Sequence, residues 1–333
     1  MKKISLFLFI ILLQSCTGQQ KKINGVSLVA SPDALTKESI NPLLEINANY
    51  ASVMPFGFIK NTEHPEVFFN TERQWYGETN EGVKQYIELL KKNKIKIMLK
   101  PQIWIWHGEY TGLLKMTSEE HWKELEQSYE KFILNYAILA EETHCELLCI
   151  ATELELFIKH RPQYWDELIS KIKKVYSGKL TYAANWDEYK RVPFWEKLDY
   201  IGIDAYFPIS DNKTPTLTEA KKGWTRWKTE MKNLSIKTNK KIIFTEYGYR
   251  SIDFAGKEPW TTHRTISETN LASQTILLRA LFEEIWDENY FAGGFIWKWF
   301  VDHNNVGGEE NNRFTPQNKP SQKLIQQHYN HAN

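Results

Sequence analysis

Eight short runs of apolar, β-branched or aromatic residues recur along this chain of 333 residues, and amphipathic segments separate most of them. Each run is nearly continuous in apolar character, which is typical of parallel strands that are covered on both faces. Eight such strands, alternating with helices, predict a single-domain (β/α)₈ barrel, the TIM-barrel fold. The runs are Ile23–Val29, Tyr50–Phe56, Ile95–Lys100, Leu147–Glu153, Leu180–Trp186, Tyr200–Tyr206, Lys241–Glu246 and Gly294–Trp297.

The segments between the runs carry signals of helices. Asn80–Asn93 has apolar residues at helical spacing, and Thr117 with Glu120 predicts a capping box that opens a long helix toward Glu142. The fifth and sixth runs lie too close together for a full helix, so this connection is expected to be short or degenerate. Further helices are expected at Trp165–Val175, Thr218–Leu234 and Ser267–Asn289.

The amino terminus has the layout of a secretory signal. Lys2 and Lys3 precede the apolar run Ile4–Leu13, which is too short to span a bilayer as a helix. The run ends in Leu13-Gln14-Ser15-Cys16, which resembles a bacterial lipobox, where the cysteine is lipidated and becomes the first residue after cleavage. We therefore expect a protein of the bacterial cell envelope that a lipid on Cys16 holds on a membrane, with the outer membrane favoured.

The division of the chain follows from these features. We expect a signal peptide at 1–15, a tether at 16–22, the barrel at 23–318 and a polar C-terminal tail at 319–333. The formal net charge is only +1 and no basic stripe is present, which disfavours a nucleic-acid partner. Contact with a membrane is expected only through the lipid, and the protein is expected to be a monomer.

Metal and thiol chemistry have little support in the sequence. Cys145 and Cys149 lie in an apolar stretch, about 13 Å apart if it is a strand, which is too far for a disulfide. They are interpreted as core residues. The histidines show no metal-ligand spacing, and no Gly-rich phosphate loop or Gly-x-Ser-x-Gly turn is present. No cofactor or metal is therefore expected.

Two apolar runs end in a glutamate. The fourth run ends at Glu153 and the seventh at Glu246. Because the active site of a (β/α)₈ barrel lies at the carboxyl ends of its strands, both carboxylates are expected at the mouth of one cavity. Two carboxylates so placed are what retaining glycoside hydrolysis requires, one as acid/base and one as nucleophile. A single glutamate after a strand is as often a helix cap, so the prediction rests on the pair.

One ambiguity remains within the fourth strand end. Glu155 has the same strand parity as Glu153 and is expected on the same face if the strand continues. Glu153 is preferred because the apolar run stops there.

The other strand ends carry aromatic, amide and charged side chains rather than packing residues. Aromatic faces bind the apolar faces of sugar rings, while amides and carboxylates bind sugar hydroxyls. Each tryptophan alone is more typical of a core, but five at three strand ends favour sugar binding. The candidate substrate-binding residues are Lys100, Gln102, Trp104, Trp106, Asn185, Trp186, Asp204, Tyr247, Trp297 and Trp299.

Three tyrosines are close to the proposed nucleophile in barrel order or in sequence, Tyr206, Tyr247 and Tyr249. A tyrosine hydroxyl that donates to the Glu246 carboxylate would keep it charged and oriented. A structural charge network is the alternative reading for Lys100 and Asp204.

With these residues in place, the chain resembles a clan A glycoside hydrolase, and most closely glycoside hydrolase family 113, whose characterised members are β-mannanases. The resemblance spans roughly Ile23 to Asp302. It rests on Leu99-Lys100-Pro101, Ala151-Thr152-Glu153-Leu154, Ala184-Asn185-Trp186-Asp187, Gly202-Ile203-Asp204-Ala205-Tyr206, Thr245-Glu246-Tyr247-Gly248 and Gly294-Phe295-Ile296-Trp297-Lys298-Trp299.

The resemblance implies a role for four of these residues. Glu153 is the implied acid/base, Glu246 the nucleophile, Tyr206 its hydrogen-bond partner and Trp297 the platform under the cleaved sugar. The implied substrate is a β-linked polysaccharide or oligosaccharide, with β-1,4-mannan first, and other β-glycans are alternatives. The rival function is a tethered sugar-binding barrel without catalysis.

One position departs from the pattern of the clan. Many clan A families have Asn directly before the acid/base, where it contacts the sugar 2-OH, and here that residue is Thr152. Asn185 is the candidate to replace this contact.

Overall fold

The computed structural model describes residues 21–261 and 268–331. The expected signal peptide, Cys16 and the first part of the tether lie outside the described residues, as does Ser267, where a helix was expected to begin. In the described part of the chain, no helix has the length and apolar character needed to cross a bilayer.

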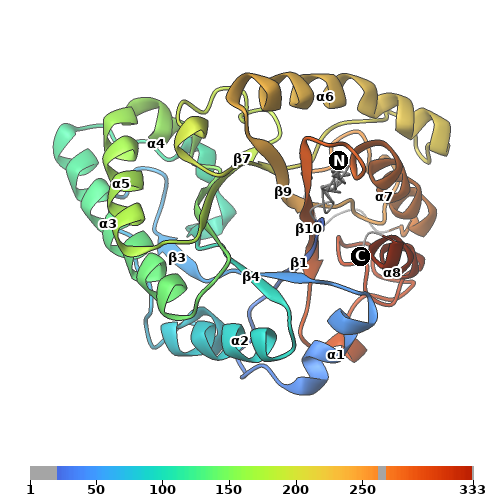
Figure 1. The fold of residues 1–333 in the computed structure, drawn as a ribbon, viewed down its shortest axis with the longest axis horizontal. Helices are drawn as coiled ribbons and strands as arrows, with labels where there is room; N and C mark the ends of the chain where they lie inside the picture. The colour runs from blue at the N-terminus through green and yellow to red at the C-terminus, as the bar shows by residue number, and fades with distance from the viewer. Residues whose placement is uncertain (1–20, 262–267, 332–333) are drawn as a thin grey trace, which may run out of the picture.

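Eight parallel strands form a closed barrel, in the order β1-β2-β4-β6-β7-β8-β9-β10 and back to β1 (Figure 1). Each of the eight apolar runs coincides with one of these strands, so the predicted (β/α)₈ barrel is confirmed. The barrel strands are β1 (Ile23–Leu28), β2 (Tyr50–Val53), β4 (Lys96–Leu99), β6 (Leu147–Thr152), β7 (Lys179–Asn185), β8 (Tyr200–Asp204), β9 (Lys241–Tyr247) and β10 (Phe291–Trp299).

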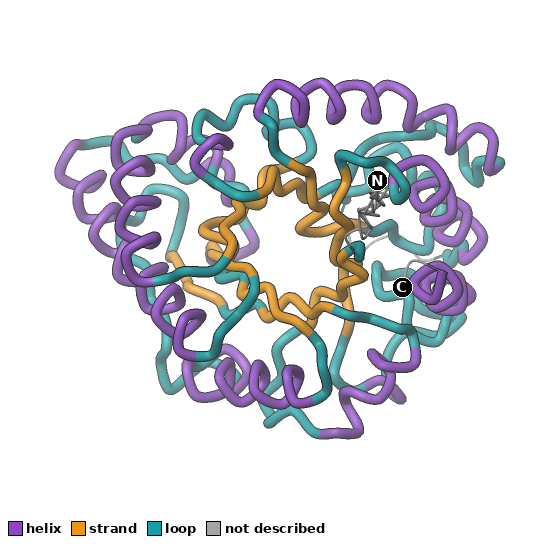
Figure 2. The backbone as a smooth tube through the Cα atoms, viewed as in Figure 1, coloured by secondary structure: helices purple, strands orange, loops and turns teal. Residues whose placement is uncertain are grey.

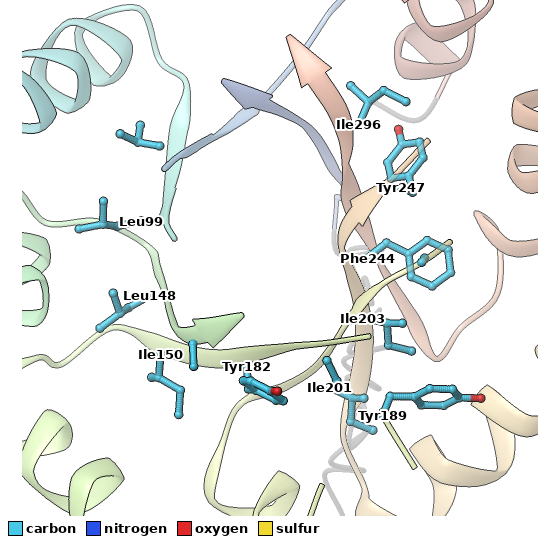
Figure 3. Packing of buried hydrophobic residues seen from close by; sticks show 14 of the residues in the cluster. Leu99, Leu148, Ile150, Tyr182, Tyr189, Ile201, Ile203, Phe244, Tyr247 and Ile296 are labelled. Atoms are coloured by element: carbon cyan, nitrogen blue, oxygen red, sulfur yellow. The ribbon is translucent and has the colours of Figure 1, made fainter. Parts of the chain in front are cut away.

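The strands are apolar on both faces because both faces are buried. Alternate residues fill the inside of the barrel, where Met98, Cys149 and Phe295 belong to one small cluster. The intervening residues, such as Leu148 and Phe244, belong to a larger cluster between the strands and the helices (Figure 3). Cys145 and Cys149 are buried free thiols.

A ring of helices surrounds the strands (Figure 2). The helices predicted from sequence form, with shifted ends. The cap of α3 is Ser118, whose side chain accepts from the His121 N–H at 3.2 Å, and not the predicted Thr117–Glu120 box. The helices are α1 (Lys37–Glu45), α2 (Asn80–Lys92), α3 (Glu119–Glu142), α4 (Glu155–His160), α5 (Pro162–Val175), α6 (Leu217–Thr238), α7 (Leu271–Ile285) and α8 (Pro320–His331).

The connection between β7 and β8 contains no α-helix, only a short 3₁₀ turn at Trp195–Lys197, as the spacing of the runs predicted. The segment expected as a C-terminal tail instead forms α8. Its buried residues Ser321, Ile325 and Tyr329 recur every four positions, so only a narrow stripe of an otherwise polar helix packs on the barrel. The Tyr329 hydroxyl donates to the Gly25 carbonyl at 2.8 Å.

A second, two-stranded parallel sheet extends two of the barrel strands beyond the barrel. It consists of β3 (Phe56–Ile59) and β5 (Gln102–Ile105), which the sequence did not reveal. Pro55 lies between β2 and β3, and Pro101 between β4 and β5. Backbone hydrogen bonds continue past Pro101, because the Lys100 N–H donates to the Val53 carbonyl and the Gln102 N–H to the Pro55 carbonyl, each at 2.9 Å. Pro55 has no N–H to donate in return.

Candidate active site

Side chains from the carboxyl ends of the strands converge on a cavity of about 740 Å³. Glu153 and Glu246 both line it, although they come from β6 and β9. Of the other candidate residues, the cavity lining includes Gln102, Trp104, Asn185, Trp186, Asp204, Tyr206 and Trp297.

A β-bulge turns Glu246 toward the cavity. Ile203 pairs with Phe244 and Asp204 with Glu246, so two steps on β9 match one step on β8. In regular pairing Glu246 would face outward with Phe244, but the extra residue reverses the alternation. Glu246 then faces the cavity and Tyr247 faces the helices, as its ring contacts with Phe282 and Trp286 show.

Three side chains hold the Glu246 carboxylate. The Tyr206 hydroxyl donates to Oε2 at 2.7 Å, and Gln102 Nε2 donates to Oε1 at 3.3 Å. The Lys100 ammonium forms an ion pair with the same Oε1. Both carboxylate oxygens are therefore held by donors, which fixes the orientation of the group.

Lys100 lies beneath the cavity and is fully buried. Its Nζ lies 3.5 Å from Oδ1 of Asp204, as well as contacting Glu246. Burial alone would lower the pKa of Lys100, but the charges of Asp204 and Glu246 raise it above its ordinary value. Lys100 therefore stays cationic between two carboxylates. It does not line the cavity, so the expectation that it contacts the substrate is corrected in favour of the alternative charge network.

Asp204 is buried beside this ion pair. Burial and the charge of Glu246 raise the pKa of Asp204, while Thr245 donates to its Oδ1 at 2.7 Å. Its Oδ2 has no hydrogen-bond partner among the described residues. Asp204 lines the cavity, but this oxygen itself is shielded from solvent.

Glu153 occupies a different electrostatic setting. Burial, together with the charges of Asp204 and Glu246, raises the pKa of Glu153 well above its ordinary value. None of the ion pairs of the described residues involves Glu153. Its backbone N–H donates to the Ala183 carbonyl at 2.8 Å, and its φ of 50° turns the chain sharply after β6.

Glu155 does not share this position. The strand ends at Thr152, and Glu155 is the first residue of α4, so the strand parity considered from sequence does not extend to it. Its carboxylate forms an ion pair with Arg191 at 2.6 Å, and it does not belong to the cavity lining.

Aromatic rings form two walls of the cavity. Trp104 on β5 lies edge-on to Phe56 of β3, with ring centroids 6.4 Å apart, and 49% of Trp104 is exposed. On another side Trp186 stacks on Trp260 at 5.0 Å. Trp297 adds a further ring near the end of β10, and the Lys298 ammonium lies 5.4 Å from its centre. Both walls leave aromatic faces available to sugar rings.

Three candidate residues lie elsewhere. Trp106 follows β5, is 61% exposed and is absent from the cavity lining. Tyr247 is buried behind β9, where its hydroxyl lies 2.7 Å from that of Tyr329. Trp299 is buried and stacks on His303. Regular alternation would place it on the same side as Trp297, but a bulge between Ile296 and Trp299 breaks the alternation along β10. The expectation that these three contact the substrate is therefore corrected.

Several residues of the cavity were not found from sequence. Tyr110, Trp260 and Phe314 line it from long loops rather than from strand ends. The Tyr110 hydroxyl accepts from Asn185 Nδ2 at 2.7 Å, which places that amide across the cavity mouth. No signal in the sequence marks these positions, because their loops have no regular pattern.

No group of three or more His, Cys, Asp or Glu side chains within 21–261 and 268–331 has an arrangement that could hold a metal ion. The acidic groups of the site face Lys100 or one another instead.

Solved structures with the same fold include members of one enzyme family. The family 113 glycoside hydrolase AaManA, a β-mannanase from Alicyclobacillus acidocaldarius in complex with ManMIm, is 21% identical with a TM-score of 0.81, covering 94% of this chain and 98% of that one. A complex of a β-1,4-mannanase of the same family is 20% identical with a TM-score of 0.81, covering 93% and 99%.

More distant barrels match as well. The β-glucuronidase of Ruminococcus gnavus is 14% identical with a TM-score of 0.58, and the match covers 88% of this chain and 46% of that one. No curated protein sequence gives a significant match. The model of Glycoside Hydrolase Family 113 matches residues 31–319, which is most of the chain. The chain therefore belongs to glycoside hydrolase family 113.

Proposed function

We propose that this glycoside hydrolase cleaves β-linked glycans with retention of anomeric configuration, and that its substrate is β-1,4-mannan or manno-oligosaccharide. One observation carries the proposal: two carboxyl groups line one cavity in opposite electrostatic settings. Glu246 is held by Lys100 and Tyr206, whereas Glu153 has a pKa raised well above its ordinary value. This division suits an ionised nucleophile and a protonated acid.

The reaction follows from these roles. Glu153 donates its proton to the glycosidic oxygen as the bond to the leaving sugar breaks, and Glu246 attacks the anomeric carbon to form a covalent glycosyl ester. Glu153, now ionised, removes a proton from water as that water attacks the anomeric carbon, and Glu246 leaves as a carboxylate. The proton on Glu153 is thereby restored.

The change in the charge of Glu246 during the reaction alters the pKa of Glu153. During glycosylation Glu246 loses negative charge, so the charge repulsion that raises the pKa of Glu153 also falls. The pKa of Glu153 therefore falls in the glycosyl intermediate, so the carboxyl group stays ionised after giving up its proton and can act as the base in the second step. Lys100 remains to stabilise Glu246 as it leaves.

Mannan is proposed as substrate because two similar solved structures are β-mannanases of the same family. Other β-glycans, and a barrel that binds glycan without cleaving it, are the competing functions. Incubation with linkage-defined oligosaccharides, read by new reducing ends and product mass, separates them. The proposal expects cleavage of manno-oligosaccharides by the wild type and none by Glu246→Ala. Unchanged mannan together with cleaved glucan would overturn the substrate assignment.

Comparison of the wild type with Glu246→Ala separates a catalytic protein from one that only binds glycan. If the variant still binds mannan in affinity electrophoresis but releases no sugar, the carboxylate acts in the reaction. Retention of mannan by both proteins without cleavage would favour the binding barrel.

We also propose that a lipid on Cys16 anchors the barrel to a membrane, with the outer membrane preferred. The support is the sequence Leu13-Gln14-Ser15-Cys16 after a short apolar run. Labelling cells with a radioactive fatty acid should mark the wild type and not Cys16→Ala. Equal labelling of both would contradict the anchor.

A further inference from the structure

A buried carboxylate lies behind the wall of the cavity, where the mechanism makes no use of it. Glu188 follows β7 in the turn after Asn185, and its side chain is 1% exposed. The ion pairs of the described residues do not include it. A buried carboxylate without a cation is costly unless hydrogen bonds compensate for the lost water.

Both oxygens of Glu188 accept hydrogen bonds. The Tyr182 hydroxyl donates to Oε1 at 2.6 Å, and the Asn185 N–H donates to Oε2 at 3.1 Å. The second bond closes the local turn. The bond from Tyr182 is not part of that turn. Tyr182 lies on β7, and its hydroxyl reaches the end of the neighbouring strand β6.

At that strand end the Tyr182 hydroxyl accepts a hydrogen bond from the Leu154 N–H at 2.8 Å. Leu154 follows Glu153 directly, and the Glu153 N–H is itself held by the Ala183 carbonyl. Both peptide N–H groups around the acid/base are therefore fixed by β7. A hydroxyl that donates to a carboxylate is a stronger acceptor, because hydrogen bonds in a chain polarise one another.

The backbone at this point needs such support. Glu153 has a φ of 50°, in the left-handed region that residues other than glycine and asparagine rarely adopt. If the Leu154 N–H lost its acceptor, the turn could relax, and the Glu153 carboxyl would move with it.

We propose that Glu188 is a positioning residue that acts through the Tyr182 hydroxyl and the Leu154 N–H to aim the carboxyl group of Glu153 at the glycosidic oxygen. The inference rests on the proposed function, in which Glu153 is the acid/base. The Glu188–Tyr182 pair should therefore affect proton donation to the leaving sugar, and it should not affect the attack by Glu246.

Proton donation matters most when the leaving group is a poor one. A natural sugar leaving group needs the proton, whereas dinitrophenolate leaves without it. Tyr182→Phe and Glu188→Gln should therefore lower kcat/KM for mannotetraose by about 10- to 100-fold. The same variants should change glycosylation by dinitrophenyl β-mannobioside by less than about threefold, since attack by Glu246 is intact.

Tyr176→Phe is the matched control. It removes a buried tyrosine hydroxyl that donates to the Cys145 carbonyl at 2.9 Å, at the opposite end of the barrel. This control should match the wild type on both substrates. Equal losses on both substrates in Tyr182→Phe and Glu188→Gln would mean a general structural role, and full activity on both would mean none; either result overturns the inference.

A second measurement does not depend on turnover. Hydrogen exchange of the Leu154 amide should be faster in Tyr182→Phe and Glu188→Gln than in the wild type, while the Ile158 amide, bonded to the Leu154 carbonyl, exchanges as before. Unchanged exchange at Leu154 would overturn the link. If the wild type cleaves neither substrate, the proposed function fails, and the exchange data alone decide whether Glu188 holds this backbone.

Discussion

The hydroxyl of Tyr206 donates a hydrogen bond of 2.7 Å to Oε2 of Glu246, across the gap between the ends of β8 and β9. Tyr247, the next residue after Glu246, has its hydroxyl against Tyr329 on the outer side of the barrel. Two tyrosines close to one carboxylate thus face opposite sides of the sheet. The bulge in β9 causes this difference.

The two tyrosines give a matched pair of variants. Tyr206→Phe should lower kcat/KM about 10- to 100-fold, because a hydrogen bond to a charged group is worth about 1.5–3 kcal/mol. Tyr247→Phe should leave kcat/KM unchanged and lower the free energy of unfolding by about 1 kcal/mol. Steady-state kinetics and denaturant unfolding of both variants check this. Full activity in Tyr206→Phe would remove the hydroxyl from the mechanism.

Activity should depend on the protonation of Glu153. Burial and nearby negative charges raise its pKa, so the acid form persists to higher pH than an ordinary glutamic acid would allow. The kcat/KM for manno-oligosaccharide should fall as pH rises through this pKa, because the deprotonated group cannot donate. In Glu153→Gln, the residual kcat/KM for the same manno-oligosaccharide should no longer show this fall. A fall that persists would assign the titration to another group.

The same raised pKa has a consequence for stability. Because Glu153 holds its proton more tightly in the folded state than in the unfolded one, the folded state binds more protons above the ordinary pKa. Stability is then lost as pH rises from that value through the folded pKa. Glu153→Gln removes this loss.

Glu153→Gln should accordingly be more stable than the wild type at about pH 8. The difference should shrink at about pH 5. Thermal unfolding at both pH values measures it. A variant that is less stable than the wild type at the higher pH would show that the carboxylate is well solvated.

The aromatic wall on β5 should matter for long substrates. Trp104 lines the cavity and Trp106 does not, although both follow the same barrel strand and are well exposed. Trp104→Ala should raise KM for polymeric mannan roughly three- to tenfold, the size expected for an aromatic contact of about 0.5–1.5 kcal/mol. Trp106→Ala should leave KM unchanged. Equal effects of both would move the binding surface toward the loop that follows β5.

The barrel strands could be predicted because each is buried on both faces and therefore appears as a continuous apolar run. The extension β3–β5 could not, because Pro55 and Pro101 separate four-residue strands that are too short to form a pattern. α8 was missed for a related reason. Its buried stripe is one residue wide, so its composition is that of a solvated tail.

The residues of the site that could be predicted from the sequence are those at the ends of barrel strands. Glu153, Glu246 and Asp204 lie at such ends, and the fold brings them together. Strand alternation alone would have placed Glu246 outside, since Phe244 faces outward, and the bulge that corrects this has no sequence signal. Glu188 was missed because it is neither at a strand end nor in a helix, and only its contact with Tyr182 reveals a role.

Trapping of the glycosyl intermediate tests the central claim most directly. A 2-deoxy-2-fluoro-β-mannosyl fluoride slows both steps, but it has a leaving group that needs little protonation, so the ester should accumulate on Glu153→Gln. Peptide mass spectrometry should then find one sugar on the peptide that contains Glu246, attached to that carboxyl group. A label on any other residue, or a first product of inverted anomeric configuration from the wild type, would contradict the two-carboxylate mechanism.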